Sequence, residues 1–347
     1  MHWTQYTVVA QADGASPRPA RRFTPAGFLA WVVAQRAEAR EVHSCYEAGA
    51  FGYVLHRKLV ALGIKNVVVR PRDWDEYHKK VKTDRRDALA LCGMLERHLA
   101  GNTEALCVIR VPSEAEEQSR GQTRQRDSLV KDRGRIGNRG LGTARYYGFD
   151  LPARWWRPRA FVRLAGELPA HLYETLARWQ ALLLEMDRQI AALTALIEAA
   201  ASAGERPAGV GALTAGTLDR EAGEWRRFQN RREVASYTGL IPGEHSSGAS
   251  HRQGAITKHG NRRMRTAAIE TAWRLLRFQP GYHAVKRLGP ALQQARLRGQ
   301  SARRRKLLVA LARQFVVDWW RLRTGRASPA QLGLRLAHPP PVPVASP

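Results

Sequence analysis

Residues 42–71 read VHSCYEAGAFGYVLHRKLVALGIKNVVVRP, and this stretch decides the fold class of the first third of the chain. Val42–Tyr46 is a β-prone run, and the amphipathic segment Phe51–Leu62 that follows ends at Gly63, a residue suited to the end of a helix. Val67–Val69 is a short, wholly apolar strand. A strand, a helix and a second strand in this order predict an α/β unit whose functional residues lie at the carboxyl ends of its strands.

The segments on either side extend the same alternation. Tyr6–Gln11 is expected to be a strand that ends at the turn-forming pair Asp13-Gly14, and Pro25–Arg36 is expected to be a helix. Asp84–Leu99 has the pattern of a third helix. We therefore expect an α/β domain over residues 1–110.

The chain has 347 residues, enough for two domains, and a formal net charge of +27 with a pI near 11.2. Such an excess of positive charge favours a polyanionic partner. The sequence has no apolar run of the roughly 18 residues that a membrane-spanning helix needs and no N-terminal signal sequence. Its three cysteines have no C-x-x-C spacing, so neither a disulfide framework nor a zinc site is expected. We expect a cytoplasmic protein with no membrane partner.

Residues 111–165 are expected to form a basic helical segment that binds nucleic acid. Two pairs of aromatic residues, Tyr146 with Tyr147 and Trp155 with Trp156, are interleaved with many arginines and few acids. Cations and aromatic rings together suit contact with a phosphate backbone and stacking on bases. The alternative is a solvated helix face. The candidate contacts are Arg120, Arg124, Lys131, Arg135 and Arg139.

Residues 166–204 are expected to form a long coiled-coil helix. Apolar residues recur there at alternating spacings of four and three, which is the heptad pattern of a coiled coil. They are Leu172, Leu176, Trp179, Leu183, Met186, Ile190, Leu193 and Ile197. The pattern fits a homo-oligomer, dimer or tetramer, paired through residues 172–197, and it fits equally a helix that packs within its own chain.

Residues 205–325 are expected to form a C-terminal domain, and residues 326–347, which become proline-rich after His338, a disordered tail. Residues 206–218 resemble a helix-hairpin-helix turn. Residues 239–265, GLIPGEHSSGASHRQGAITKHGNRRMR, place Ser246 and Ser247 beside a glycine and among many cations.

An uncrowded hydroxyl flanked by cations suits attack on a phosphodiester. A surface loop that caps a helix is the alternative. The candidate phosphate contacts in this stretch are Arg252, Lys258, Asn261, Arg262, Arg263 and Arg265.

Three carboxylates form a second candidate site. Asp84 and Asp87 are three residues apart at the start of the predicted helix, which places them on one helix face, and Glu47 follows a predicted strand. Carboxylate oxygens from a strand end and a helix start suit one or two Mg²⁺ ions. The alternative is structural: Asp84 caps the helix, and Asp87 pairs with a neighbouring arginine.

Taken in order, these motifs resemble DEDD-type insertion-sequence transposases. The resemblance covers about residues 2–280 and rests on six blocks, of which KTDRRDA and the serine block are the most specific. The blocks are YEAG, VVVRP, KTDRRDA, VPSEAEEQSR, PAGVGALTA and GLIPGEHSSG with RQGAITKHGNRRMR. The resemblance implies an RNase H-like (RuvC-like) N-terminal catalytic domain, then the mostly helical transposase domain with the serine motif.

The resemblance also implies roles. Glu47, Asp84 and Asp87 take places in a Mg²⁺-binding catalytic set, and Ser247 takes the place of the nucleophile, with its neighbour Ser246 as the second candidate. It further implies a guide RNA encoded by the mobile element, DNA as substrate, and an oligomer in which carboxylates and serine come from different subunits.

One departure from the family pattern concerns the start of the chain. The resemblance implies an aspartate at the end of a first strand, and the chain begins just after that position, so the domain is expected to lack its first strand. Asp13 cannot substitute, because it sits at the far end of the predicted hairpin. A start codon assigned too late and a truncated, inactive copy are both consistent with this. Two further functions stay open: a junction nuclease that uses water, and a nucleic-acid-binding remnant.

Overall fold

The computed structural model describes residues 4–71, 83–202, 206–244 and 253–337. The chain divides into two compact units, Met1–Pro112 and Ser113–Pro347, which are described separately. Helices predominate and the sheets are small, which is compatible with the expected order of an α/β unit followed by a helical one. No helix among these residues is both long enough and apolar enough to cross a bilayer.

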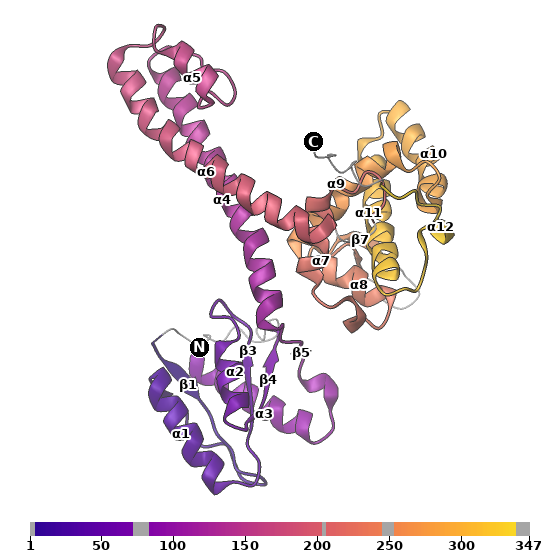
Figure 1. Ribbon diagram of the computed structural model, residues 1–347. Coiled ribbons are helices and arrows are strands. Elements are labelled where there is room, and N and C mark those ends of the chain that lie inside the picture. Colours follow the sequence, from indigo (N-terminus) through magenta and orange to yellow (C-terminus); the bar gives the residue numbers. More distant parts are fainter. Residues whose placement is uncertain (1–3, 72–82, 203–205, 245–252, 338–347) are drawn as a thin grey trace, which may run out of the picture. The chain divides into compact units, whose positions relative to one another are not determined.

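The N-terminal unit opens with the hairpin β1 (Tyr6–Val8) and β2 (Arg21–Phe23), followed by α1 (Pro25–Glu38) (Figure 1). A three-stranded sheet follows in the order β3-β4-β5, with β3 parallel to β4 and β5 antiparallel to it. Its strands and the remaining helices of the unit are β3 (His43–Glu47), α2 (Val54–Ala61), β4 (Lys65–Val69), α3 (Asp84–Leu99), a 3-10 turn (Thr103–Ala105) and β5 (Val108–Ile109).

The strand-helix-strand prediction for residues 42–71 is confirmed element by element. Gly63 has φ +76°, the left-handed conformation expected of a residue that ends a helix. Two apolar clusters fill the unit: α1 and α2 contribute Phe28 and Leu59 to one, and β4 and α3 contribute Val69 and Met94 to the other. The unit therefore holds its sheet between helices.

The second unit begins with a helical arm, formed by α4 (Glu114–Tyr146), α5 (Pro158–Leu164) and α6 (Ala170–Ser202) (Figure 1). Ser113 caps α4 in a capping box with Glu116. The predicted heptad residues of α6 lie on its inner face: Leu172, Leu176 and Leu183 are fully buried and pack in one cluster with side chains of α4. The apolar face of α6 thus packs against α4 of the same chain. This favours packing within the chain over pairing between two copies.

The tryptophans of the arm correct a prediction. Trp155 and Trp156 are buried, with Nε1 of Trp155 donating to the Gly137 carbonyl (3.0 Å) and Nε1 of Trp156 donating to Asp187 (2.9 Å). A side chain at Gly140 would collide with the Trp155 ring. These rings close the end of the arm and are not available for stacking on bases. Only the tyrosine pair of the four aromatics is exposed.

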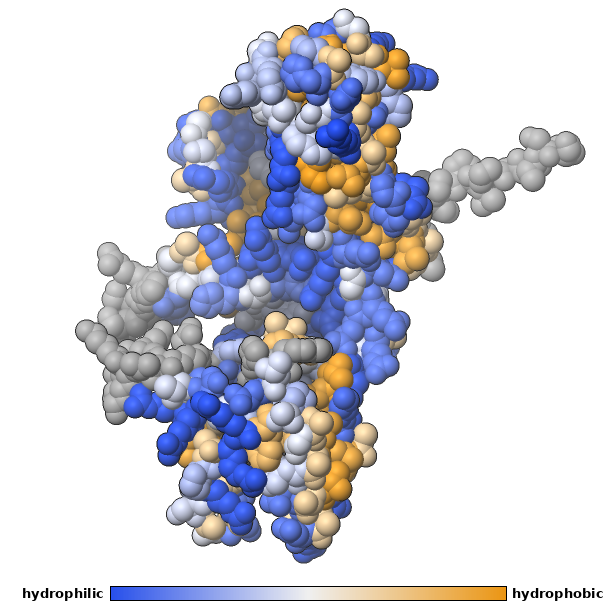
Figure 2. Space-filling view, turned by 90° about the vertical axis from the view of Figure 1, so that its left-hand side faces the viewer, coloured by the Kyte–Doolittle hydropathy of each residue, from blue (hydrophilic) through white to orange (hydrophobic). Residues whose placement is uncertain are grey.

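A C-terminal body follows the arm. Its elements are α7 (Ala212–Ala222), a 3-10 turn (Trp225–Arg227), α8 (Arg231–Thr238), the antiparallel pair β6 (Pro242–Glu244) and β7 (Gln253–Ile256), α9 (Arg262–Phe278), α10 (His283–Leu297), α11 (Ser301–Arg323) and α12 (Pro329–Leu332). Phe315, Trp319 and Leu311 of α11 lie at the centre of its core. Hydrophilic residues cover much of the face shown in Figure 2, with apolar residues in smaller patches.

The prediction of a disordered tail over residues 326–347 is wrong for residues 326–337. Residues 326–337 are part of the body: α12 forms, Leu332 and Leu334 are buried, and Leu336 bridges to Pro207. Ser328 supplies a capping box for this short helix, a signal that a reading based on proline content overlooks. Residues 338–347 lie outside the described residues.

Candidate functional site

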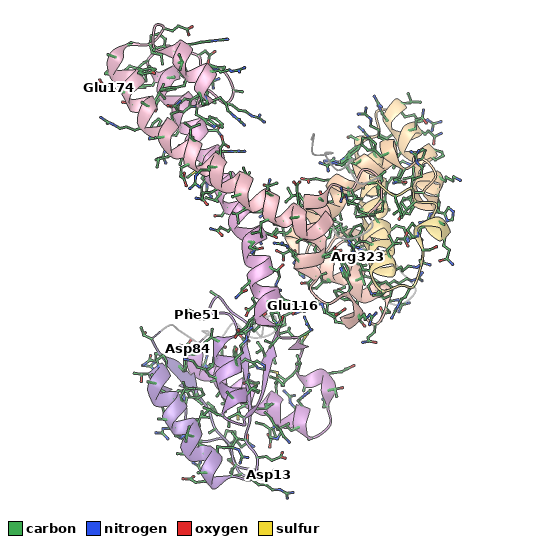
Figure 3. All side chains as sticks on the ribbon, in the orientation of Figure 1. Asp13, Phe51, Asp84, Glu116, Glu174 and Arg323 are labelled. Carbon is green, nitrogen blue, oxygen red and sulfur yellow. The ribbon has the colours of Figure 1, made fainter. Side chains whose placement is uncertain are left out.

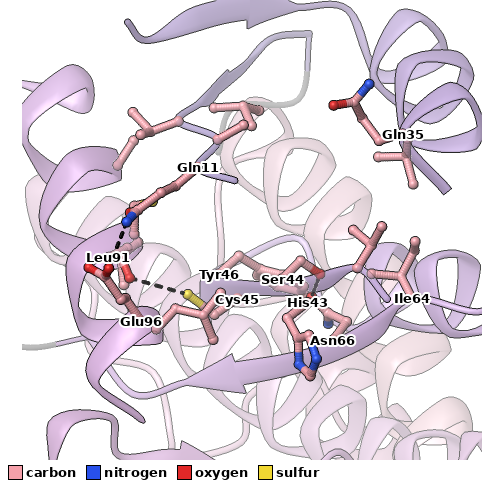
Figure 4. A pocket seen from close by; sticks show the side chains of 18 of the residues that line it. Gln11, Gln35, His43, Ser44, Cys45, Tyr46, Ile64, Asn66, Leu91 and Glu96 are labelled. Carbon is pink, nitrogen blue, oxygen red and sulfur yellow. Dashed lines mark hydrogen bonds between the residues drawn. The ribbon is translucent and has the colours of Figure 1, made fainter. Parts of the chain in front are cut away.

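A pocket of about 1380 Å³ opens in the N-terminal unit between the β1–β2 hairpin, β3 and helices α1 and α3 (Figure 4). All three candidate carboxylates, Glu47, Asp84 and Asp87, line it. The sequence separates Glu47 from the two aspartates by more than thirty residues, and the fold brings them to one cavity.

Local structure explains where each carboxylate lies. Glu47 is the last residue of β3 and is half-buried. Thr83 caps α3 by accepting from the Arg86 backbone N–H (3.4 Å), so Asp84 and Asp87 fall in the first helical turn, where the helix dipole favours negative charge. The cap is therefore Thr83, and Asp84 is left exposed. Asp13 also lines this pocket, but Figure 3 shows it at the opposite end of the unit from Asp84.

The interior of the pocket is held by short polar contacts. Gln11 donates to the Glu96 carboxylate (2.7 Å), Ser44 donates to the Asn66 side-chain oxygen (2.7 Å), and the Cys45 thiol lies 3.7 Å from the Leu91 carbonyl (Figure 4).

Burial, with the nearby Cys92 and Glu47, raises the pKa of the Cys45 thiol to about 12. At neutral pH this thiol is protonated, so it is not a nucleophile.

The pocket is bordered by two strands that each pair on one side only. Among the described residues, β1 pairs only with β2, and β3 pairs only with β4 on its sheet. Every residue of β1 and of β3 lines the pocket, and α3 packs against both strands. The pocket therefore lies between two sheet edges whose backbone groups have no strand partner within the described parts of the chain.

The donor chemistry of the pocket suits a hard cation, since seven acidic residues line it, among them Glu47, Asp84 and Asp87. However, across residues 4–71, 83–202, 206–244 and 253–337, no three acidic, histidine or cysteine side chains come close enough together to hold one metal ion. Glu47, Asp84 and Asp87 thus share a cavity without forming a closed metal site by themselves.

Ser246, Ser247 and Arg252 lie outside the described residues. The strands that flank them, β6 and β7, pair antiparallel with Pro242 opposite Ile256. Two backbone bonds continue this pairing beyond the strands: the Thr257 N–H donates to the Ile241 carbonyl at 2.9 Å, and the Lys258 N–H donates to the carbonyl of Gly239, the C-cap of α8, at 3.2 Å. The segment that carries the serines therefore begins and ends at two paired strands.

The residues after the hairpin form a tight junction with α8. Gly260 has φ +152°, and a side chain there would approach the Tyr237 carbonyl to 2.5 Å. Asn261 caps α9 by accepting from two backbone N–H groups at 3.0 and 3.1 Å. The Arg265 guanidinium donates to the carbonyls of Thr238 (2.8 Å) and Lys258 (3.1 Å). Residues 260–265, the G-N-R-R-M-R block, thus have a structural role: they hold the end of β7 against α8. We call β6, β7 and the segment between them the serine hairpin.

The buried carboxylate of Glu221, on α7, contacts this junction through Asn261 and Arg263. The side chain of Glu221 is inaccessible to solvent and accepts two hydrogen bonds from Arg124 (3.2 and 3.1 Å) and one from Asn261 (2.8 Å). Nε of Arg263 lies 3.9 Å from Glu221 and donates to Asp127 at 3.0 Å. Burial alone would raise the pKa of Glu221, but the hydrogen bonds from Arg124 and Asn261 and the charges of Arg124 and Arg263 hold it below its ordinary value.

We call this set the Glu221 network: Glu221, Arg124, Asp127, Asn261 and Arg263. It joins α4, α7 and the start of α9. Nothing in the sequence singled out Glu221, because its partners are distant along the chain and one glutamate in a helix carries no pattern.

The structure sorts the predicted nucleic-acid contacts into two groups. Arg124, Asn261, Arg263 and Arg265 are engaged in holding the fold, as described above. Arg120 is half-buried, and Arg135 pairs with Asp132 at the surface (2.9 Å). Their contact with nucleic acid stays a prediction, as it does for the exposed cations Lys131, Arg139, Lys258 and Arg262.

Comparison with known proteins gives the class. The chain is 31% identical over 329 residues to the putative transposase y4rJ of Sinorhizobium fredii, covering 85% of this chain and 82% of that protein. It is 30% identical over 319 residues to putative transposase y4qE of the same organism, covering 82% and 76%. It is 26% identical over 268 residues to the transposase for insertion sequence element IS1111A of Coxiella burnetii, covering 74% and 71%.

These relatives define a class, the transposases of insertion sequences, which process DNA. The sequence pattern of the transposase IS116/IS110/IS902 family matches residues 203–287, the part of the C-terminal body that contains the serine hairpin and α9. The chain belongs to the IS116/IS110/IS902 family of transposases.

Proposed function

We propose that this transposase cuts and rejoins DNA through a covalent link to Ser247. In the proposed step the Ser247 hydroxyl loses its proton and its oxygen bonds to the phosphorus of the scissile phosphodiester, while the bond to one bridging oxygen breaks and that oxygen takes up a proton. A hydroxyl of the second DNA strand later attacks the phosphoserine, which restores the serine. No water is consumed, so the phosphodiester energy is retained.

The observation that carries the proposal is the construction of the described residues at the base of the segment that contains Ser247. A flexible surface loop does not need a glycine at φ +152°, an asparagine cap and an arginine bound to two carbonyls at its base. A nucleophile does need such a base, because its oxygen must be held in line with the phosphorus. Lys258 and Arg262 are exposed beside the hairpin and suit contact with neighbouring phosphates.

We propose a second part of the machinery at the pocket of the N-terminal unit. Glu47, Asp84 and Asp87 would be ligands of Mg²⁺ together with at least one further oxygen ligand, since the three do not close a site themselves. Bound Mg²⁺ supplies positive charge against the charge that builds on phosphorus.

The edges of β1 and β3 that face the pocket are where the further ligand would enter: a strand formed by residues other than the described ones, or by another chain, could pair with both edges. This supports the RNase H-like (RuvC-like) reading of the unit, which implies such a strand.

An element-encoded guide RNA and a homo-oligomer complete the proposal. The net charge of +27 supports a polyanionic partner in addition to the DNA. The heptad seam supports no interface between copies, because its side chains are buried within the arm, so an oligomer would need another surface.

The test is a search for covalent adducts with a nicked or intact DNA of the element's ends, in the presence of the co-purified RNA and Mg²⁺. The parent chain is expected to give a protein–DNA adduct that is resistant to denaturant, and Ser247→Ala is expected to give none. Adducts that persist in Ser247→Ala but vanish in Ser246→Ala would move the nucleophile by one residue. Hydrolysed ends without adducts would favour a junction nuclease, and binding without breakage would favour an inactive remnant.

The carboxylates are tested with matched variants. Asp84→Asn is expected to abolish the strand cleavage that requires divalent ions. It is also expected to abolish the rise in melting temperature that Mn²⁺ causes in the parent. Asp13→Asn, at the other end of the same unit, is expected to change neither. Equal behaviour of the two variants would argue against a metal site at Glu47, Asp84 and Asp87.

A further inference from the structure

A basic and aromatic face on the C-terminal body lies outside both parts of the proposed strand-exchange machinery. Helix α9 exposes one stripe of side chains along its length, and α11 packs beside it (Figure 1). The exposed residues of this stripe are Arg262, Thr266, Glu270, Trp273, Arg274 and Arg277, with Phe278 at the end of the helix. We call these residues, with the start of α11, the α9–α11 face. At 1.5 Å per residue the stripe is about 22 Å long.

Two aromatic rings of this face are left open to solvent. Trp273 and Phe278 are each 42% exposed, although the buried positions of the same helix, such as Ala272 and Leu275, already fill the core. Each ring has an arginine over one of its faces, and the rest of the ring is exposed: the guanidinium carbon of Arg304, in α11, lies 4.6 Å from the centre of the Trp273 ring, and that of Arg277 lies 5.4 Å from the centre of the Phe278 ring. The exposed part of such a ring can stack on a base, and the cation can bind the phosphate of the same nucleotide.

The α9–α11 face carries many cations and few acids. Glu270 is the only acid on the exposed stripe of α9. No ion pair joins the exposed cations of this face to an acid anywhere in the described parts of the chain; Arg303 makes one long hydrogen bond to Gln300 (3.4 Å). These cations are Arg262, Arg274 and Arg277 on α9, with Arg303 and Arg305 on either side of Arg304 in α11. Unpaired cations at this density favour a polyanion.

We propose that the α9–α11 face binds an unpaired strand of nucleic acid, with bases stacked on Trp273 and Phe278 and phosphates held by the cations around them. The open rings decide between partners. A duplex keeps its bases stacked inside and offers only phosphates, and an acidic protein offers only charge, so neither uses exposed aromatic faces. Both a displaced DNA strand and an unpaired stretch of RNA have the required chemistry.

The proposal rests on the proposed function only in taking nucleic acid as the partner. The face has no part in bond breakage, so Ser247→Ala should bind single strands as the parent does. Loss of binding in a variant of the face, together with normal binding by Ser247→Ala, separates failure of this proposal from failure of the serine mechanism.

The test measures binding of the full chain to a fluorescent oligothymidylate of about 12 nucleotides, within the usual site size of single-strand binders. Trp273→Leu keeps apolar bulk and loses the ring system, and it is expected to weaken binding about 5- to 30-fold. Trp273→Phe keeps a ring and should recover part of the loss. Phe51→Leu is the matched control, because Phe51 is 41% exposed but lies in the N-terminal unit; its affinity should stay within about twofold of the parent.

Charge and stacking are separated by two further measurements. The double variant Arg274→Gln/Arg277→Gln should lower the slope of log affinity against log salt by about 1.4, which is 0.7 per phosphate contact on a single strand. An abasic oligomer of the same length should bind the parent and Trp273→Leu equally. An oligouridylate in place of the oligothymidylate identifies the source: tighter binding assigns an RNA, and weaker binding a DNA strand.

The proposal is overturned if Trp273→Leu, with the melting temperature of the parent, binds the oligothymidylate as tightly as the parent does. It is overturned equally if Trp273→Leu weakens the abasic oligomer or a matched duplex as much as the single strand. Displacement of the oligomer by polyglutamate at equal charge would show that charge alone is recognised, which also rejects the stacking role.

Discussion

Replacing Glu221 by glutamine tests whether the Glu221 network holds the base of the serine hairpin. The substitution keeps the shape of the side chain and removes its charge. The carboxylate has no solvent-accessible surface and accepts three hydrogen bonds, two from a guanidinium and one from an amide. Hydrogen bonds to charged groups contribute about 1.5–3 kcal/mol each, and Arg124 is itself half-exposed, so we expect Glu221→Gln to lower the free energy of unfolding by about 2–4 kcal/mol.

The pH dependence of this loss follows from the direction of the pKa shift. The pKa of Glu221 is lower in the folded protein than its ordinary value, 4.5. Its contribution to stability is therefore complete above about pH 4.5 and is lost as the pH falls through the lower folded pKa. The difference in unfolding free energy between parent and Glu221→Gln should be largest at pH 7 and should shrink as the pH falls below 4.5 and through the lowered pKa of Glu221.

The assay is urea unfolding of the full chain at several pH values, followed by tryptophan fluorescence and circular dichroism. Glu185→Gln is the control, since Glu185 makes a short contact to Arg188 (2.6 Å) that is fully exposed on the arm, where water and salt screen the pair. A glutamine variant of Glu221 that unfolds at the same urea concentration as the parent at pH 7 would refute the network. So would an effect no larger than that of Glu185→Gln.

Three other pairs of variants test the architecture. Gly140→Ala places a methyl group against the buried ring of Trp155 and should lower the stability of the arm by about 1–3 kcal/mol or more. Gly142→Ala, on the same helix with open space around it, should raise the stability by up to about 1 kcal/mol. Thermal unfolding of the two variants compares them. Leu183→Ala should cost about 2–5 kcal/mol without changing the molar mass by light scattering, and Leu182→Ala, its half-exposed neighbour, should cost little; a change of mass in Leu183→Ala alone would restore the intermolecular reading of the seam. Gly260→Ala should destabilise the body and abolish covalent adducts together, and a stable variant without adducts would show that the glycine acts on the hairpin alone.

Periodic signals in the sequence were sufficient to place the elements of residues 42–71, helix α3 and helix α6. The alternation over residues 42–71, the acid-rich start of α3 and the heptads of α6 all depend on neighbours within a turn or two, and such neighbours are visible in the sequence. The heptads did not reveal their partner. A seam looks the same whether it faces a second copy or α4 of the same chain, and only the closure of the arm by Trp155 decides it.

The candidate site was predictable to the extent that it is built from strand ends and helix starts. Glu47 and Asp84 were expected to meet because both lie where an α/β unit collects its functional residues, and they do line one pocket. Whether the carboxylates converge on one metal ion could not be predicted, because no local pattern in the sequence carries the distances between them; among the described residues they do not close such a site.

The roles of the arginines could not be predicted from the sequence because they depend on where the few acids are placed. Glu221 binds Arg124 across 97 positions, Asp187 binds Arg133 across 54, and Asp219 binds Arg323 across 104. Each of these acids is at least partly buried and holds helices together, so it no longer offsets the charge of exposed cations. A fold that commits its acids to internal pairs leaves a surface whose cations have few acidic neighbours. We infer that this division, rather than the total charge alone, concentrates positive potential on faces such as that of α9 and α11, where an unpaired strand would meet cations and open rings together.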